Sequence, residues 1–253
     1  MISILMPTFN EAAQLPATFA SLRAQTVAHE VIVVDARSTD ETSAVAREHG
    51  ARVIESPYRQ RAAQMNAGVR AARGEFLLFL HADTRLAPAA LGKIADAFRD
   101  SATLGGGFAR RYDAPSWVLR LTCALAELRT RCFGWFLGDQ AMFVRLSAFE
   151  ELGGFREWDI FEDLDFSRRL ARTGRVVTLR PPVISAGRRF TKRGAVRTTW
   201  SDLLLIARYA LATEHRLPAC AARGHPARAS EQAQHAGSPL AAPAGSLCSK
   251  TKP

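Results

Sequence analysis

Cysteine is scarce in this chain, whose 253 residues include four: Cys123, Cys132, Cys220 and Cys248. No two of them have the CxxC spacing of a zinc site, and together they form no recognisable disulfide framework. Such sparse cysteines are typical of a protein that stays in a reducing compartment. We therefore expect neither a cysteine-based metal site nor a disulfide-stabilised fold.

Long apolar runs and two common motifs are also missing. No stretch is apolar over the length that a bilayer-spanning helix needs, and the N-terminus enters an apolar strand without the basic segment or cleavage site of a signal peptide. No Gly-x-Gly-x-x-Gly follows the first strand, which excludes a dinucleotide-binding oxidoreductase. Aromatic residues make up 8% of the chain, and no nucleic-acid-binding motif is recognised. We therefore expect a cytoplasmic protein with no nucleic-acid partner.

The composition suits one compact folded domain. Hydrophobic residues make up 47% of the chain and charged residues 23%, which is enough to bury a sizeable core. The formal net charge is +10. Such a charge favours anionic partners, among them nucleotide diphosphates and acidic lipid surfaces, but it does not choose between them.

Apolar runs alternate with helical patterns along the first half of the chain. The runs are short, and 31–34 is dense in β-branched residues, as in a parallel strand covered on both faces. Ser38 and Glu41 have the spacing of a capping box that opens a helix ending near Gly50. The predicted strands are 2–6, 31–34, 52–55 and 76–80, with helices around 15–22, 38–50 and 62–69. This alternation predicts an α/β fold with a mostly parallel sheet flanked by helices.

The second half of the chain is less regular. We predict strands that begin at Gly105 and span 140–144, and helices over 117–131, from Glu162 to near Gly174, and after Thr198. From about Glu214 the composition changes to Ala, Pro, Gly, Ser, His and Arg without periodicity, which is typical of a disordered segment. The prediction is one folded domain over 1–212 and a disordered tail over 213–253.

The predicted strand 76–80 ends in a short polar segment that contains Asp83. In an open α/β sheet, ligands collect at the carboxyl ends of the strands. Asp83 is therefore placed to hold a metal ion or a sugar-phosphate.

Six short motifs follow one another along the folded part of the chain. They are MPTFNE at 6–11, VVDARSTD at 33–40, QMNAG at 64–68, LHADT at 80–84, GDQ at 138–140 and EDLD at 162–165. In wording and order they resemble those of family 2 glycosyltransferases, which have the GT-A fold. Each motif alone is weak, but their agreement in order makes the resemblance specific over about 1–212. Within the family, the chain most resembles small bacterial enzymes called transferase 2, which are associated with radical-SAM and selenodomain proteins.

The resemblance implies that the donor is a nucleotide-diphosphate sugar. The residues that it places around this donor are Pro7, Thr8, Glu11, Asp35, Arg61, Asn66 and Asp83. A guanidinium suits the paired oxygens of a diphosphate. From the residues alone, other roles stay open: Glu11 caps the next helix, Asp35 is an ordinary turn carboxylate, and Arg61 lies on a solvated helix face.

Members of this family commonly carry Asp-x-Asp at the end of the fourth strand, where this chain has His81-Ala82-Asp83. The resemblance makes Asp83 a ligand of Mn²⁺ or Mg²⁺ that bridges the metal to the donor diphosphate. Oxygen ligands suit both cations, whereas His81, in the place of the first Asp, suits Mn²⁺ better than Mg²⁺. For His81 alone, an imidazole at the core edge that bonds to the backbone is the favoured interpretation.

Glu162 and Asp163 stand at the start of a predicted helix. The resemblance places in this pair the base that removes the acceptor proton during inverting transfer, with Asp163 as the expected base. Acidic residues in a first helical turn also complement the helix dipole, and the two roles are compatible. Asp139 and Gln140, which follow Gly138, are expected in a turn on the acceptor side.

A basic run at 188–193 precedes Trp200 and an apolar helix. This pattern suits docking on an anionic leaflet and a lipid acceptor, although the helix could equally pack on the sheet. The Gln-x-x-Arg-Trp motif of processive synthases is absent, so we expect single transfer.

The resemblance predicts an inverting, non-processive glycosyltransferase. Its acceptor would offer a hydroxyl or carboxylate on a lipid or carotenoid-like molecule, and the enzyme would be peripheral on the inner face of the cell membrane. The alternative is a non-catalytic nucleotide-sugar-binding or membrane-docking module, because the Asp-x-Asp motif is degenerate.

Overall fold

The computed structural model describes residues 1–114, 116–187, 190, 197, 199, 200 and 204. The chain divides into two units, 1–206 and 207–253, and every described residue belongs to the first unit. Its strands are β1 (Ile2–Thr8), β2 (His29–Asp35), β3 (Arg52–Glu55), β4 (Phe76–Phe79), β5 (Thr84–Arg85), β6 (Thr103–Tyr112), β7 (Phe143–Arg145) and β8 (Arg175–Ser185). Its helices are α1 (Leu15–Arg23), α2 (Thr42–Glu48), α3 (Arg61–Ala71), α4 (Ala90–Ala97), α5 (Trp117–Phe133), η1 (Gly138–Gln140), α6 (Leu146–Glu151) and α7 (Glu162–Thr173).

The strands of the described residues form one sheet in the order β3-β2-β1-β4-β7-β6-β8-β5. β1 lies between β2 and β4 and is parallel to both, with Ile2 opposite His29 and Phe76. β7 runs antiparallel to β4 and β6, and β5 runs antiparallel to β8. The chain therefore moves outward from β1 to β3 and then returns to β4 on the other side of β1. Such a reversal leaves a crevice at the carboxyl ends of the two central strands.

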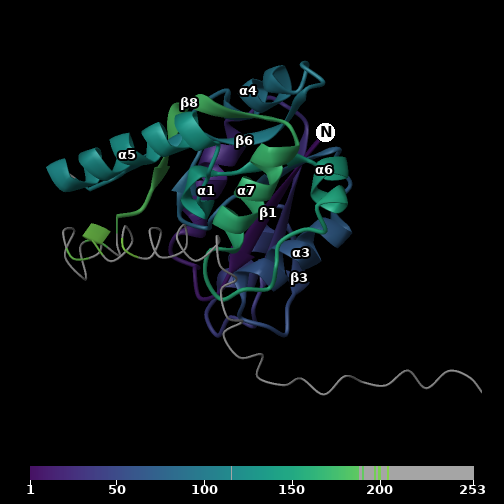
Figure 1. Ribbon diagram of the computed structural model, residues 1–253. Helices are drawn as coiled ribbons and strands as arrows, with labels where there is room; N and C mark the ends of the chain where they lie inside the picture. The colour runs from purple at the N-terminus through teal and green to yellow at the C-terminus, as the bar shows by residue number, and fades with distance from the viewer. Residues whose placement is uncertain (115, 188–189, 191–196, 198, 201–203, 205–253) are drawn as a thin grey trace, which may run out of the picture. The chain divides into compact units, whose positions relative to one another are not determined.

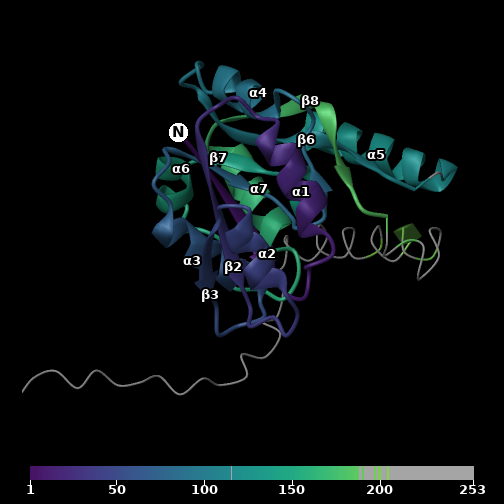
Figure 2. The same cartoon turned by 180° about the vertical axis from the view of Figure 1, so that it is seen from behind.

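Side chains alternate across the sheet and build an apolar core on each face. In β1, Ile4 and Met6 pack in one core, and Leu5 packs in the other. α1, α2 and α4 contribute to the first core, and α3, α6 and α7 contribute to the second. Figure 1 views the molecule from the side of α7, and Figure 2 from the side of α1 and α2. Because both faces are covered, the central strands are apolar along most of their length.

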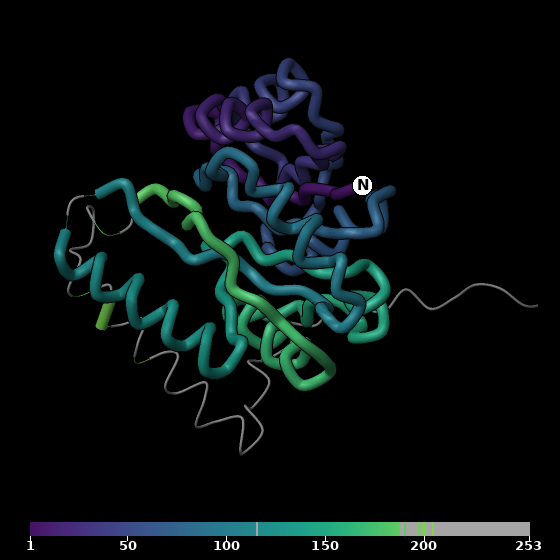
Figure 3. The backbone as a smooth tube through the Cα atoms, turned by 90° about the horizontal axis from the view of Figure 1, so that it is seen from above, coloured from purple at the N-terminus to yellow at the C-terminus, as the bar shows by residue number. Residues whose placement is uncertain are grey.

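α5 lies beside β6 and β8 at one side of the sheet (Figure 3). It buries Leu119, Thr122, Ala126 and Thr130, which recur at helical spacing. The helix ends at Gly134, whose φ of +67° is a left-handed conformation that glycine adopts without strain. This helix forms one wall of the cavity that is described below.

The predicted strands and helices of the first half are confirmed, with shifts of a few residues at their ends. In the second half, the strand predicted over 140–144 is present as β7, but it begins three residues later, at Phe143, because Gly138–Gln140 forms a 3-10 helix. The strand that begins near Gly105 extends to Tyr112. β5, α4, α6 and β8 were not predicted. β8 contains Pro181 and Pro182, which argue against a strand in a sequence.

The capping box predicted from Ser38 and Glu41 is wrong. α2 begins at Thr42, whose backbone N–H donates to the side chain of Asp40 at 3.1 Å, and its N-cap residue Glu41 makes no side-chain capping bond. Ser38 instead donates hydrogen bonds from its backbone N–H and its hydroxyl to the carboxylate of Asp35, at 2.8 and 2.5 Å. Ser38 therefore donates to the carboxylate at the end of β2 and does not cap α2, which its spacing from Glu41 had predicted.

Most of the helix predicted after Thr198, most of the basic run 188–193, and the tail 213–253 lie outside the described residues. Among the residues that the structure describes, no helix is both long enough and apolar enough to cross a bilayer.

Candidate active site

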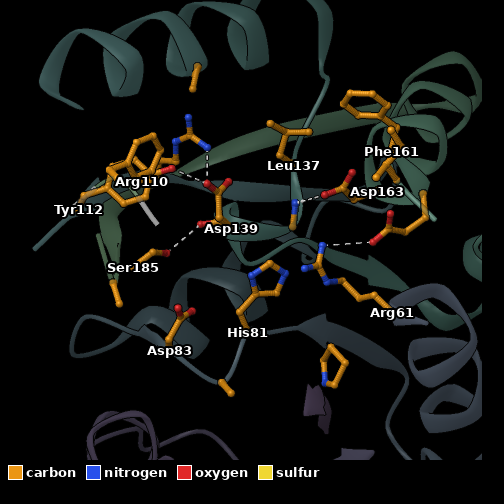
Figure 4. A pocket seen from close by; sticks show the side chains of 18 of the residues that line it. Arg61, His81, Asp83, Arg110, Tyr112, Leu137, Asp139, Phe161, Asp163 and Ser185 are labelled. Atoms are coloured by element: carbon orange, nitrogen blue, oxygen red, sulfur yellow. Dashed lines mark hydrogen bonds and ion pairs between the residues drawn. The ribbon is translucent and has the colours of Figure 1, made fainter. Parts of the chain in front are cut away.

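A cavity of about 1350 Å³ opens at the carboxyl edge of the sheet (Figure 4). Pockets for one small ligand usually span about 300–1,000 Å³, so this cavity has room for parts of two substrates. Residues far apart in sequence meet in it because the carboxyl ends of β1, β4, β6 and β8 lie at the same edge. The predicted site residues in its lining are Pro7, Thr8, Glu11, Arg61, His81, Asp83, Asp139, Glu162 and Asp163.

Three predicted site residues, Asp35, Asn66 and Gln140, do not line the cavity. Asp35 accepts a hydrogen bond of 2.9 Å from the hydroxyl of Thr8. The Asn66 amide is bonded to the backbone N–H and C=O of Phe155, at 3.0 and 2.8 Å, and so ties α3 to the segment before α7. These bonds hold both side chains within the protein, and direct donor contact stays a prediction for Asp35 and Asn66.

Gln140 is fully buried, and its side chain is bonded within the protein. Its Oε1 accepts hydrogen bonds from Arg129 at 2.8 Å and from the backbone N–H of Leu137 at 3.2 Å. Its Nε2 donates to the carbonyl of Phe108. These bonds fix the turn that carries Asp139, and an acceptor-side contact of Gln140 itself stays a prediction.

His81 lies at the centre of the cavity, between Asp83 and Arg61 (Figure 4). Burial and the charge of Arg61 lower its pKa from 6.5 to about 4, although Asp83 and Asp139 act in the opposite direction. The imidazole is therefore neutral near pH 7. Within the described part of the chain, its Nε2 atom is buried and has no hydrogen-bond partner, so the favoured backbone-bonded interpretation is not met at that atom.

Gly138 allows the backbone to pass close to the His81 ring. A Cβ atom at this position would lie 2.6 Å from His81 Nε2 and 3.1 Å from Asp163 Oδ2. Neither group could withdraw without disturbing the cavity, since the backbone N–H of Gly138 also donates to Asp163 Oδ2. Only glycine therefore fits the first position of the GDQ motif.

Glu162 and Asp163 open α7 and are both nearly fully buried. Burial and the neighbouring charge of Asp163 raise the pKa of Glu162 from 4.5 to about 7, partly offset by Arg61, which lies 3.4 Å from Glu162 Oε1. Burial also raises the pKa of Asp163, against the effects of Arg61 and of backbone N–H groups from Gly138 and Leu164. The pair is thus able to exchange a proton near neutral pH.

Asp139 is held by two residues of β6. Arg110 and Tyr112 both donate to its Oδ2 atom, and the hydrogen bond from Tyr112 is 2.7 Å long. Burial alone would raise the pKa of Asp139, but the charge and hydrogen bond of Arg110, with the hydrogen bond of Tyr112, lower it to about 2. Its Oδ1 atom is buried without a hydrogen-bond partner among the described residues, and is therefore available to accept one from a ligand.

Sequence reasoning missed Arg110, Tyr112 and Arg129, which all line the cavity. The prediction gave a start at Gly105 for this strand but no end, so the first two were not placed on it. Had the strand been continued to Tyr112, both residues would have fallen at its carboxyl end. Arg129 faces the cavity from α5, and no local pattern distinguishes it from a solvated helix residue.

The donor groups for a metal ion are few. Within the described ranges, no group of three or more His, Cys, Asp or Glu side chains is placed to hold a metal. The cavity does offer the Asp83 carboxylate and the partnerless Nε2 of neutral His81. Hard divalent cations are often held by one or two carboxylates together with substrate phosphates and waters. These donors therefore fit a cation that completes its coordination with a diphosphate.

A mostly parallel sheet with a substrate-sized cavity beyond β1 and β4, and a carboxylate pair across that cavity, defines a domain of the GT-A glycosyltransferase class. Residues 3–153 match the model of the family "Glycosyl transferase family 2". The chain therefore belongs to this family. The transferase 2 subgroup stays a prediction.

Two relatives and one solved structure are similar to this chain. A "PGL/p-HBAD biosynthesis glycosyltransferase" of Mycobacterium bovis is 29% identical over 225 residues, which cover 84% of this chain and 85% of the relative. An uncharacterized glycosyltransferase of Mycobacterium bovis is 31% identical over 132 residues, 51% of this chain, and the match spans only 59% of that relative's length.

The solved structure is a mannosyltransferase from Pyrobaculum calidifontis in complex with GDP-Man and Mn²⁺. It superposes with a TM-score of 0.67 at 23% sequence identity, covering 86% of this chain and 65% of the mannosyltransferase. At this level of identity the similarity shows that the two proteins share a fold.

Proposed function

We propose that this chain transfers a sugar from a nucleotide-diphosphate donor to a hydroxyl or carboxylate of an acceptor. The observation that carries the proposal is that the buried carboxylates Glu162 and Asp163 share one cavity with the ends of β1 and β4. The Pyrobaculum protein of the same fold binds GDP-Man with Mn²⁺, which supports both a nucleotide sugar and a divalent cation.

The donor occupies the side of the cavity formed by β1, β4 and α3. Pro7, Thr8 and Glu11 receive the nucleoside, and Arg61 lies where its guanidinium can bind diphosphate oxygens. Asp83, with the neutral imidazole of His81 beside it, holds the cation. When bound, a divalent cation neutralises charge that develops on the departing diphosphate.

Asp163 acts as the base in an inverting transfer. Backbone N–H groups of Gly138 and Leu164 bond to its two oxygens and fix the orientation of the carboxylate. The remaining lone pairs face the cavity and accept the proton of the attacking hydroxyl. Burial and the charge of Asp163 in turn raise the pKa of Glu162 to about 7.

The acceptor occupies the side formed by α5, β6 and the segment before α7. Asp139 Oδ1 accepts a hydrogen bond from an acceptor hydroxyl, since Arg110 and Tyr112 occupy only Oδ2. An apolar part of the wall on this side, beside the polar Thr122 and Arg129, consists of Leu125, Ala126, Leu137, Ile160, Phe161 and Phe190. An apolar wall supports a lipid or carotenoid-like acceptor. The enzyme transfers a single sugar to this acceptor and is peripheral on the inner face of the membrane.

A thermal-shift screen of UDP-, GDP- and dTDP-sugars, with and without Mn²⁺, tests the donor half of the proposal. A ligand at 100 times its Kd stabilises the fold by about 2.7 kcal/mol, so a true donor gives a clear shift. The transfer half is tested by release of nucleoside diphosphate in the presence of lipid acceptors. If no nucleotide sugar shifts the melting temperature, the proposal fails.

A non-catalytic nucleotide-sugar-binding module is the second candidate. It is favoured by the substitution of His81 for the first Asp of the motif, which leaves fewer oxygen ligands for a metal. The same screen separates the two functions. A module would show a donor shift with no release of nucleoside diphosphate under any acceptor.

A further inference from the structure

α5 presents an apolar face to solvent as well as to the sheet. Trp117, Leu121, Leu125 and Leu128 are 70%, 51%, 42% and 59% exposed. Their spacing of four, four and three residues aligns them in one stripe along the helix. This stripe, called the α5 stripe below, lies opposite the face that packs on β6 and β8. Exposed apolar surface that is gathered in this way usually marks an interaction site.

Exposed cationic side chains lie along one edge of the α5 stripe. They are Arg120 and Arg131 of α5 and Arg180 of β8, whereas Arg129 on the other edge turns inward and donates to the carbonyl of Trp135 and to Gln140 Oε1. The single acidic residue of α5 is Glu127, which is paired with Arg131 at 2.8 Å and with Arg180. The helix surface therefore combines an apolar stripe with an excess of positive charge. This combination is the signature of a helix that lies in the interface of an anionic lipid layer.

The α5 stripe is continuous with the acceptor side of the cavity. Leu125 belongs to the stripe and also lines the cavity, where Thr122, Ala126 and Arg129 of the same helix accompany it. Ile160, across the cavity mouth, is also exposed. A molecule seated on α5 would therefore reach the cavity without crossing open solvent.

We infer that α5 docks this protein on an anionic lipid surface and delivers an amphipathic acceptor from that surface into the cavity. The delivery step rests on the proposed function, whereas the docking step does not. Trp117 suits the docking, because its ring is favoured at the boundary between headgroups and acyl chains. The lipid surface is favoured over a second copy of the chain, since two copies of α5 would bring arginines against arginines.

The far C-terminal segment is a poor alternative occupant. Residues 213–253 contain no aromatic residue, Val, Ile or Met, and offer three leucines. Such a composition cannot match the apolar area of a tryptophan and three leucines. Composition therefore argues against residues 213–253 as the occupant of this face.

Vesicle flotation of the full chain tests the docking step without any need for activity. Vesicles of phosphatidylcholine with 30% phosphatidylglycerol are compared with vesicles of pure phosphatidylcholine. We expect binding to the anionic vesicles, a blue shift of tryptophan emission, and weaker binding as salt rises. No binding to the anionic vesicles would overturn the inference.

The double variant Leu121→Glu/Leu128→Glu should bind anionic vesicles at least about tenfold more weakly, because two apolar contacts become anionic. Tyr58→Glu, at an equally exposed aromatic between β3 and α3, is the matched control and should bind as the wild type does. Binding of the double variant equal to that of the control would contradict the assignment.

Light scattering and melting temperature distinguish the other occupants. A wild-type dimer that the double variant abolishes would assign the stripe to a second copy and overturn the inference. If the wild type binds no vesicles and the melting temperature of the double variant falls by many degrees, the α5 stripe packs against another part of this chain, and the inference is overturned. Nucleoside diphosphate release with a short, water-soluble acceptor should be unchanged in the double variant, so a failure of the transferase proposal would be visible separately.

Discussion

Replacement of Asp163 by Asn gives the sharpest test of the proposed chemistry. The side chain keeps its size but can no longer take a proton. In the wild type, both carboxylate oxygens accept hydrogen bonds from backbone N–H groups, Oδ1 from Leu164 at 2.6 Å and Oδ2 from Gly138. In Asp163→Asn, the amide nitrogen must face one of these N–H groups, whichever way the amide is turned.

This geometry sets two separate magnitudes. General-base catalysis usually contributes about 10²- to 10⁴-fold, so turnover should fall by at least about 100-fold. One backbone N–H loses its acceptor, which costs about 1–3 kcal/mol of unfolding free energy. Burial raises the pKa of Asp163, so removal of the buried charge offsets part of this cost. We therefore expect a melting temperature lower by only a few degrees.

The assay combines single-turnover kinetics, calorimetric donor affinity and a melting curve on the same preparation. Donor affinity should stay within about threefold of the wild type, because Asp163 contacts the acceptor proton and not the nucleotide. The matched control is Asp165→Asn, in the same helical turn and equally buried, where the carboxylate is paired with Arg156 and Arg169 at 3.2 and 2.8 Å. This control should lose stability and keep its turnover.

Two results would refute the reasoning. Turnover of Asp163→Asn within a few-fold of the wild type would show that the carboxylate is structural. An equal loss of turnover in Asp165→Asn would show that any weakening of α7 abolishes activity, whatever the role of Asp163.

Three further predictions concern the rest of the cavity. In Glu162→Gln, the free energy of unfolding should depend less on pH than in the wild type. The pKa of Glu162 rises from 4.5 to about 7 on folding, so between these values the native wild type binds a proton that the unfolded chain does not. The unfolding free energy of the wild type therefore falls by up to about 3 kcal/mol as the pH rises from about 4.5 to 7. Urea titrations across that pH range should show that the unfolding free energy falls more steeply with pH in the wild type than in Glu162→Gln. Parallel pH dependences of the two proteins would contradict the raised pKa of Glu162. Asp83→Asn should weaken donor binding about tenfold or more in calorimetry with Mn²⁺ and little without it, while unchanged affinity with Mn²⁺ would remove Asp83 from the metal site. Arg110→Met leaves the Asp139 carboxylate without its cation and should cost about 3 kcal/mol of unfolding free energy, a loss that Arg110→Met/Asp139→Leu should partly restore.

Much of the fold could be predicted because its signals are local. The β-branched run 31–34 and the helical spacing of Leu15, Phe19 and Leu22 each lie within a few residues, and the structure confirms both elements. β8 was not predicted, because its two prolines argue against a strand and its pairing is with the distant strands β6 and β5. The strand predicted over 140–144 begins only at Phe143, because the preceding Gly138 and Asp139 are held in a 3-10 helix by contacts with distant residues.

Local sequence patterns set the alternation of strands and helices and the order of the motifs, and hence the family. They also set which polar residues follow each strand, since these are properties of neighbouring positions. Which of those residues face the cavity depends on how the folded chain packs. Asn66 is bonded to Phe155, 89 positions away, and Arg110 is paired with Asp139, 29 positions away. The protonation of His81 and Glu162 was decided in the same way, because burial and distant charges set their pKa values, and both arise only when the chain is packed.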